Sequence, residues 1–386
     1  MNRWCYGAPV TTSSNDSLII PERLEALVAR CRREVDEGRL PGYQLAVGFD
    51  GEVAYFEAYG AARDDHRFHT YSAVKPTVSL TLLELAAEGA LGLDDPVSSI
   101  LESFVGGGKD QVSVSQVLLH AGGFPTGPMS MAVAAHRPDR LERYRSWHTT
   151  FTPGSAFEYH PTAAHWVLAD IIEQVSGRPY ADVITERVME PAGVSRWLAI
   201  PQPEQDTIVD VFDVGAPTDP VEFAAQFGFE PIETEVTNDA LKVFNQPEVR
   251  ELGVPGGGGV CSAAEMAGWY QAILHDQGNI LRPEVRQDAL TVVRQRHPDF
   301  FGVSANRTHA FVLAGDDGQA AARGHGHTVS AGTFGHGGAR GQIGWADPVS
   351  GVSLGFMTNG LERNELVEGR RTIAISSRAG LLTTPI

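Results

Sequence analysis

Ser72, Lys75 and Pro76 form the part of the chain best suited to chemistry, because a hydroxyl and an amine lie three residues apart at an expected helix start. Proline lacks an N–H group and is tolerated in the first turn of a helix, where the backbone donors have no partner within the helix. Residues three apart share one helix face, so the Lys75 amine should lie beside the Ser72 hydroxyl. The spacing predicts a nucleophile next to its base.

This pair works only if Lys75 can accept a proton. Burial and the positive end of a helix both lower the pKa of an amine, and a neutral amine can take the proton of a serine hydroxyl. Ser-x-x-Lys also occurs by chance in chains of 386 residues. The motif therefore needs support from other parts of the sequence.

The elements before Ser72 predict a helix packed on an antiparallel hairpin. Residues Pro21 to Glu37 carry an apolar stripe at helical spacing, which includes Leu24, Leu27, Val28 and Cys31. Two strands then follow at 42–49 and 52–59, joined by an Asp-Gly dipeptide that favours a tight turn. After Ser72, a leucine-rich helix is expected to end at Gly89.

The rest of the chain predicts a helical middle and a second hairpin. Helical patterns continue to about Ser195 and include an amphipathic helix over 163–175. Residues 201–249 show no sustained period and are expected to form an irregular, lid-like excursion. The remaining expected elements are a glycine turn at 255–259, a helix at 263–275, strands at 342–345 and 352–358, and a last helix at 370–381.

Sheet elements at both chain ends around a helical middle predict an α/β fold of the α+β type. The simplest packing joins the two hairpins in one antiparallel sheet flanked by helices, with a mostly helical domain inserted. The expected division is a sheet domain from residues 1–75 and 262–386, and a helical domain from 76–261 that carries the lid-like segment. Clefts between domains often hold ligands.

Composition and charge limit the classes of partner. The formal net charge of −18 would repel nucleic acid and anionic membrane surfaces, and no membrane span or leader pattern is visible, so we expect a cytoplasmic protein. The cysteines Cys5, Cys31 and Cys261 are an odd, widely spaced set that indicates neither a disulfide framework nor a zinc site. His325 and His327 lack a third nearby ligand, so we expect neither a metal nor another cofactor.

Several further motifs resemble those of the serine β-lactamase and penicillin-binding-protein superfamily, in particular its class C β-lactamase and family VIII carboxylesterase branch. The resemblance covers about residues 41–360. Its motifs are Ser72-Ala73-Val74-Lys75-Pro76, Leu118-Leu119-His120-Ala121-Gly122-Gly123-Phe124-Pro125, Phe157-Glu158-Tyr159, Val254-Pro255-Gly256-Gly257-Gly258-Gly259 and Gly335-His336-Gly337-Gly338-Ala339.

The resemblance implies an acyl-enzyme mechanism. Ser72 would attack a carbonyl, and Lys75 or Tyr159 would hold its proton; which of the two is the base stays open. The backbone N–H groups of Ser72 and Ala339 would form the oxyanion hole. Substrate would also approach His336, and the bare backbone of Gly337 and Gly338 leaves it room.

The departures from the family pattern point toward esters. Tyr159-His160-Pro161 stands where β-lactamases have Tyr-x-Asn, so the side-chain amide that would grip an amide substrate is missing. His336 replaces a lysine and removes a permanent charge. Arg340 either restores a cation near the substrate or forms a surface ion pair. His120 is more suited to holding loop backbone than to chemistry.

The favoured prediction is a serine hydrolase, most simply a carboxylesterase for small or medium acyl esters, with a small-molecule ester as its partner. A β-lactamase, a D-amino-acid peptidase or an acyltransferase would share the same acyl-enzyme and stays an alternative. A non-catalytic binding protein should have lost its nucleophile set, whereas Ser72, Lys75 and Tyr159 are all present.

Overall fold

The computed structural model describes residues 18–231 and 235–383. Cys5 and most of the stretch Met1–Ile20 lie outside these ranges, so the expectations about them stay untested. Within the ranges, no helix combines the length and the apolar character needed to cross a membrane.

The helices and strands follow the predicted order. The α-helices are α1 Pro21–Asp36, α2 Lys75–Ala87, α3 Val97–Ile100, α4 Val114–Leu118, α5 Met131–Ala134, α6 Arg137–Tyr144, α7 Ala163–Ser176, α8 Tyr180–Ile184, α9 Pro220–Phe227, α10 Asn238–Lys242, α11 Pro247–Leu252, α12 Ala263–His275, α13 Pro283–Thr291 and α14 Glu365–Ala379. The strands are β1 Gly42–Phe49, β2 Glu52–Gly60, β3 Phe68–His69, β4 Phe212–Val214, β5 Val260–Cys261, β6 Val312–Leu313, β7 Phe334–Gly335, β8 Ile343–Ala346, β9 Ser353–Thr358 and β10 Gly360–Glu362.

The main sheet joins the two ends of the described chain. It has six strands in the order β2-β1-β9-β8-β7-β6, and neighbouring strands are antiparallel. In the register of β1 and β9, Leu45 lies opposite Phe356. The predicted α+β fold, with one antiparallel sheet built from both ends of the sequence, is therefore confirmed.

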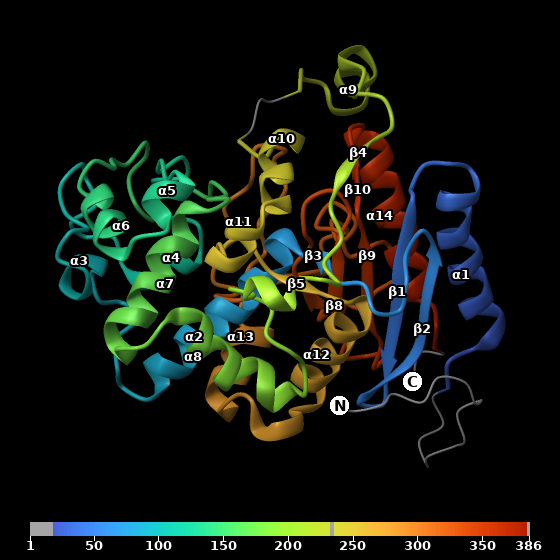
Figure 1. The fold of residues 1–386 in the computed structure, drawn as a ribbon, viewed down its shortest axis with the longest axis horizontal. Coiled ribbons are helices and arrows are strands. Elements are labelled where there is room, and N and C mark those ends of the chain that lie inside the picture. The colour runs from blue at the N-terminus through green and yellow to red at the C-terminus, as the bar shows by residue number, and fades with distance from the viewer. Residues whose placement is uncertain (1–17, 232–234, 384–386) are drawn as a thin grey trace.

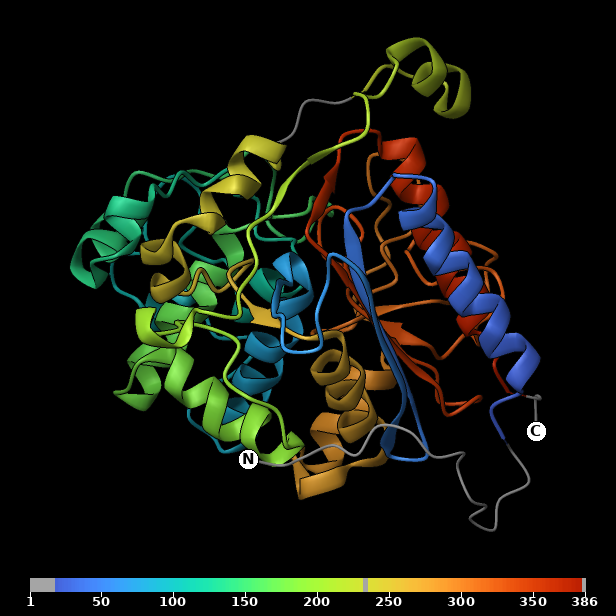
Figure 2. The ribbon, with the colours of Figure 1, turned by 45° about the vertical axis from the view of Figure 1, so that its right-hand side comes forward.

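Helices cover both faces of the sheet. Figures 1 and 2 show α1 packed along α14 on one side, and α12 lies against β1, β8 and β9 on the other. Successive residues of a strand point to opposite faces, so Leu45 and Val47 pack with the core under α1 and α14 whereas Ala46 belongs to the larger core that includes α12.

The helix α12 begins where the sequence supplies a complete N-terminal cap. The Ser262 hydroxyl accepts a hydrogen bond from the Glu265 N–H at 3.1 Å, and the Glu265 carboxylate accepts one from the Ser262 N–H at 2.9 Å. The helix lies very close to the sheet, because a Cβ atom at Gly355 would come within 2.3 Å of the Ala263 carbonyl oxygen.

A buried ion-pair network connects α1 and α14. The Arg371 guanidinium donates to Glu34 at 2.8 Å and to Glu362 at 2.8 Å, and all three side chains are almost completely buried. Hydrogen bonds from Arg39, Arg371 and Arg30 outweigh the raising effect of burial and lower the pKa of Glu34 to about 2. The first and last helices of the described chain are thereby held together.

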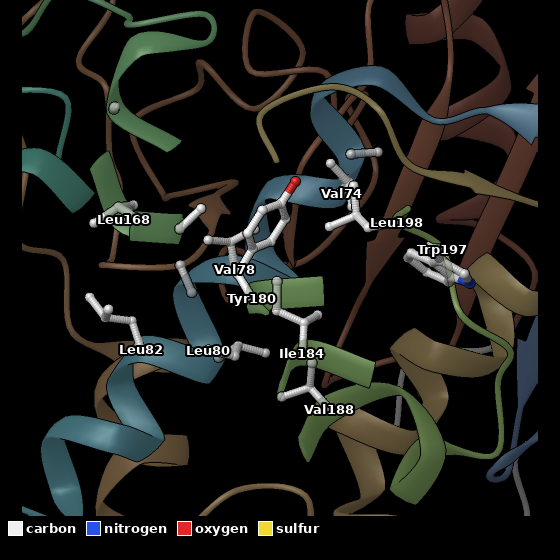
Figure 3. Close-up of a cluster of buried hydrophobic side chains, with 14 of the residues drawn as sticks. Val74, Val78, Leu80, Leu82, Leu168, Tyr180, Ile184, Val188, Trp197 and Leu198 are labelled. Atoms are coloured by element: carbon white, nitrogen blue, oxygen red, sulfur yellow. The ribbon is translucent and has the colours of Figure 1, made fainter. Parts of the chain in front are cut away.

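The helix α2 is the centre of the helical part. Its residues from Lys75 to Leu85 are buried, and Figure 3 shows Val74, Val78, Leu80 and Leu82 among apolar side chains of α7, α8 and neighbouring segments. Because it is buried and packed against these side chains, this helix gives a rigid base to the turn that carries Ser72.

Two segments differ from their sequence-based description. Residues 201–249 contain α9, α10, α11 and β4, which pairs in parallel with β10; each element is too short to give a clear periodic pattern. Both views show α9 projecting from the body of the molecule. The last helix begins at Glu365 rather than at Arg370, because the Asn364 side chain accepts from the N–H groups of Leu366 and Val367. The expected domain boundaries stay a prediction.

Candidate active site

Ser72 lies in a short 3₁₀ turn, Tyr71–Val74, which leads directly into α2. Before this turn, β3 pairs with β5, and the Thr70 N–H donates to the Gly259 carbonyl at 2.9 Å. Tyr71 has a φ of +46°, a left-handed conformation that costs a non-glycine residue free energy and is common at functional sites. The strained residue is therefore the direct neighbour of Ser72.

Three oxygen atoms surround the side-chain nitrogen of Lys75. Its Nζ lies 3.0 Å from the Ser72 Oγ, 2.8 Å from the Pro161 carbonyl oxygen, and in close contact with the Gly256 carbonyl oxygen. Carbonyl oxygens only accept, so a neutral amine would donate its two N–H groups to them and direct its lone pair at the Ser72 hydroxyl. The geometry therefore suits a lysine that accepts the serine proton.

The surroundings of Lys75 favour this neutral form. The side chain is 1% exposed, and the described residues offer it no ion pair. Burial lowers the pKa of Lys75 well below its usual value, and the nearby charge of Arg307 lowers it further.

Tyr159 is the third reactive residue, and it lies beside Lys75 and Ser72. The Lys75 Nζ lies 5.2 Å from the centre of its ring, and Ser72 is near enough to lower its pKa. Burial raises the pKa of Tyr159 more strongly, and Arg307 opposes this rise. The Tyr159 hydroxyl oxygen is buried without a well-aligned hydrogen bond within the described ranges. The phenol is thus protonated at neutral pH and free to donate.

His120 holds the Tyr159 segment in place. Its Nδ1 accepts from the His160 N–H at 3.1 Å, its carbonyl oxygen accepts from the Glu158 N–H at 3.2 Å, and its ring lies 4.6 Å from that of Tyr159. His120 is therefore in contact with the reactive tyrosine but bound to backbone. His160 is bound to the Phe124 N–H at 3.1 Å and does not reach Ser72 through any hydrogen bond.

The third motif lies beside the nucleophile. A Cβ atom at Gly338 would come within 2.0 Å of the Thr70 carbonyl oxygen, so this glycine is required by packing against the segment before Ser72. At Gly337 the nearest atom would be 3.6 Å away, which leaves room. The N–H groups of Ser72 and Ala339 donate to no acceptor among the described residues, as an oxyanion hole requires.

The side chain of His336 faces the same site. Its Nε2 lies 3.3 Å from an Arg307 nitrogen, and its Nδ1 lies 2.8 Å from the Gly337 carbonyl oxygen. Because arginine can only donate, Nε2 accepts and Nδ1 carries the proton. Burial, followed by the charges of Arg307 and Lys75, lowers the pKa of His336 well below its usual value.

Arg340 is occupied elsewhere. Its guanidinium donates to Asn238 at 2.6 Å, to the Val236 carbonyl at 3.3 Å and to Glu368 at 3.3 Å. Of the two roles considered for this residue, the structure places it in an ion pair that ties the 236–238 segment to α14.

The cation near the reactive groups is Arg307, which the sequence analysis missed. It lies 5.3 Å from the centre of the Tyr159 ring and 5.4 Å from that of Phe157. It belongs to a stretch of isolated bridges between α13 and β7 without regular periodicity, so no sequence signal pointed to it.

A small cavity adjoins Lys75. It offers about 10 Å³ to the centre of a water molecule, and its walls include Lys75, His120, His165, Arg307, His309 and His336. In the described part of the chain, no three His, Cys, Asp or Glu side chains are placed to bind a metal ion. The site offers Ser72 as a nucleophile, Lys75 as a base and the backbone N–H groups of Ser72 and Ala339 as donors.

The sequence and the fold are similar to those of known proteins. The model of the Beta-lactamase family matches residues 24–377. Esterase EstB of Burkholderia gladioli is 28% identical over 264 residues, which cover 57% of this chain and 66% of that protein. The chain thus spans slightly less than two thirds of the length of this curated relative.

Two solved structures show the same fold. A penicillin-binding-protein homologue from Caulobacter crescentus superposes with a TM-score of 0.75 at 24% identity, covering 95% of this chain and 99% of that one. A family VIII carboxylesterase superposes with a TM-score of 0.73 at 20% identity, covering 95% and 100%.

Proposed function

Because the chain belongs to the Beta-lactamase family, we propose that it is a serine hydrolase that forms an acyl-enzyme on Ser72 and acts on carboxylic esters with small or medium acyl groups. The observation that carries this proposal is the 3.0 Å contact between Lys75 Nζ and Ser72 Oγ, made while two carbonyl oxygens hold the other sides of the amine.

In the proposed acylation step, Lys75 takes the proton of Ser72 as the Oγ attacks the ester carbonyl carbon. The carbonyl oxygen becomes an oxyanion that accepts from the N–H groups of Ser72 and Ala339. The bond to the leaving alkoxide then breaks, and the alkoxide takes a proton from Tyr159 or from the Lys75 ammonium. Water hydrolyses the acyl-enzyme by the reverse sequence of proton transfers.

The preference for esters over amides follows from the groups beside Tyr159. Pro161 contributes its carbonyl oxygen to Lys75 and has no side-chain donor, while the His160 ring is bound to loop backbone. No side-chain amide therefore stands where a substrate amide would need one. The similarity to Esterase EstB supports the same class of substrate.

Hydrolysis of p-nitrophenyl esters of rising chain length, beside nitrocefin, tests the proposal. We expect turnover of the short and medium esters that disappears in Ser72→Ala and persists in Ser98→Ala, whose exposed hydroxyl is bound only to the Asp110 carbonyl. Intact-mass measurement after fluorophosphonate treatment should show one adduct, located on Ser72. Preference for nitrocefin would contradict the ester assignment, and absence of any adduct would contradict the enzyme assignment.

A further inference from the structure

Arg307 brings an unpaired positive charge to the reactive groups. One of its nitrogens lies 3.3 Å from His336 Nε2, and its guanidinium contacts the rings of Tyr159 and Phe157. Its main chain is fixed, because its N–H donates to the Gln295 carbonyl at 3.0 Å. Among the described residues, no carboxylate forms an ion pair with it.

Arg307 and Lys75 share the ring of Tyr159. The arginine carbon lies 5.3 Å and the lysine nitrogen 5.2 Å from the ring centre, so the two cations cannot be further apart than these distances added together. Both side chains also line the small cavity beside Lys75. Two like charges therefore lie on the same tyrosine ring, with Lys75 buried and Arg307 partly buried.

The other ionisable groups around the pair do not neutralise it. Asp299 acts on Arg307 only from a distance, and Asp288 is bound to His309 and Arg294. Burial keeps the remaining groups that face the pair uncharged, because it raises the pKa of Tyr159 and lowers the pKa values of His120, His165 and His336.

Arginine keeps its proton under all ordinary conditions, whereas a buried lysine readily loses its own. When both lie close together and the lysine is buried, the repulsion is relieved by deprotonation of the lysine. We propose that the fixed charge of Arg307 keeps Lys75 uncharged and so ready to accept the proton of Ser72. Arg307 is then a positioning residue that acts through Lys75, a role that rests on the proposed serine hydrolase function.

The same repulsion acts after acylation begins. Once Lys75 has taken the proton of Ser72, its ammonium lies beside Arg307 and is destabilised. The proton therefore moves on to the leaving alkoxide, and Lys75 returns to its neutral form for the next step.

The pH dependence of kcat/KM for p-nitrophenyl acetate, in wild type and Arg307→Gln, tests this role. Removing a like charge raises the pKa of Lys75, so the acidic limb should move to higher pH by about one unit. Activity near pH 6 should then fall about tenfold, while the alkaline plateau should stay within about threefold of wild type. Arg307→Lys retains a cation and should restore most of the wild-type profile.

Arg296→Gln is the matched control. Arg296 lies on the same segment, is exposed and makes no side-chain hydrogen bond in the described ranges, so its profile should equal that of wild type. Thermal denaturation shows whether each variant is folded. If Arg307→Gln does not fold, Arg307→Met tests the inference instead, since it also removes the charge and should show the same shift of the acidic limb to higher pH.

The rate of fluorophosphonate labelling of Ser72 across pH separates this inference from the proposed function. If wild type is labelled and the acidic limb of the labelling rate lies at the same pH in Arg307→Gln, the proposed role of Arg307 is overturned. An equal loss of rate at every pH would also overturn it, because that result indicates substrate binding or local structure. Absence of labelling in wild type would instead refute the proposed function.

Discussion

Gly338 packs directly on the carbonyl oxygen of Thr70, and a Cβ atom there would come within 2.0 Å of it. Thr70 precedes the turn of Ser72 by one residue, so any displacement of this contact moves the nucleophile relative to the Ala339 N–H. The bare backbone at this position serves the fit between two protein segments, and the distance between nucleophile and oxyanion donor depends on it.

Gly338→Ala should therefore reduce kcat/KM roughly 10- to 100-fold, because small displacements of reacting groups have effects of that size. Gly369→Ala is the control, since this glycine lies in the helix α14 and its new methyl group would meet no atom within 4 Å. Steady-state kinetics on a p-nitrophenyl ester measures both variants. Equal effects of the two substitutions would contradict the role given to the Thr70 contact.

Lys75→Met should lower kcat by about 10²- to 10⁴-fold through loss of the proton acceptor. Lys109 offers an unusually close comparison, because it is also buried and its Nζ contacts the carbonyl oxygens of Val105, Gly106 and Trp147. Lys109→Met should lower the thermal stability and leave kcat of the folded enzyme near wild type. Measurement of kcat for both variants below their unfolding temperatures tests this difference, and an equal loss of kcat in the two would contradict the role of Lys75 as proton acceptor.

His120→Ala should lower kcat by releasing the Tyr159 segment, whereas His120→Asn should recover much of the activity. The asparagine Oδ1 can accept from the His160 N–H as the His120 Nδ1 does at 3.1 Å. Single-turnover acylation rates compare the variants. If both variants acylate slowly and their unfolding temperatures are unchanged, His120 has a direct chemical role.

Arg371→Met should lower the free energy of unfolding by about 3–5 kcal/mol, because two buried carboxylates lose their cation. The adjacent Arg370 pairs with Glu222 at an exposed position, so Arg370→Met should cost at most about 1 kcal/mol. Urea denaturation gives both values. Activity of either folded variant should stay near wild type, since their side chains bond to Glu34, Glu362 and Glu222 and to none of the groups around Ser72.

The stability of the protein should also depend on Glu34 in acid. Its pKa of about 2 lies below the ordinary value of 4.5, so its contribution is fully present above about pH 4.5 and is lost as the pH falls toward 2. Glu34→Gln should be less stable at pH 7 and should show a smaller loss of unfolding free energy between pH 5 and pH 3 than wild type. If the unfolding free energies of wild type and Glu34→Gln fall equally between pH 5 and pH 3, this prediction is contradicted.

Local sequence signals predicted the fold well wherever one residue type dictates the backbone. Asp50 and Gly51 both adopt positive φ in the hairpin turn, and the Ser262 cap begins α12 at the predicted residue. The signals failed where elements are short or polar. The helix α14 starts in a charged stretch that carries Gly369, and α10 has only five residues.

The site was predictable only in part. The spacing of Ser72 and Lys75 indicated their contact, and the family resemblance added Tyr159. The carbonyl oxygens of Pro161 and Gly256 carry no sequence signal, because every residue has one. Arg307 could not be predicted either, since its position beside Tyr159 follows from tertiary packing and not from a local sequence pattern.

The pairing of β1 with β9 joins residues 42–49 to residues 353–358. During synthesis, the hairpin of β1 and β2 leaves the ribosome long before its partner strand exists, and its open edge must wait until nearly the whole chain has been translated. Slow loop closure over such a separation makes this interval the period of greatest exposure to aggregation. Lower temperature, which weakens hydrophobic association of the exposed edge, should accordingly increase the yield of folded protein in a heterologous host.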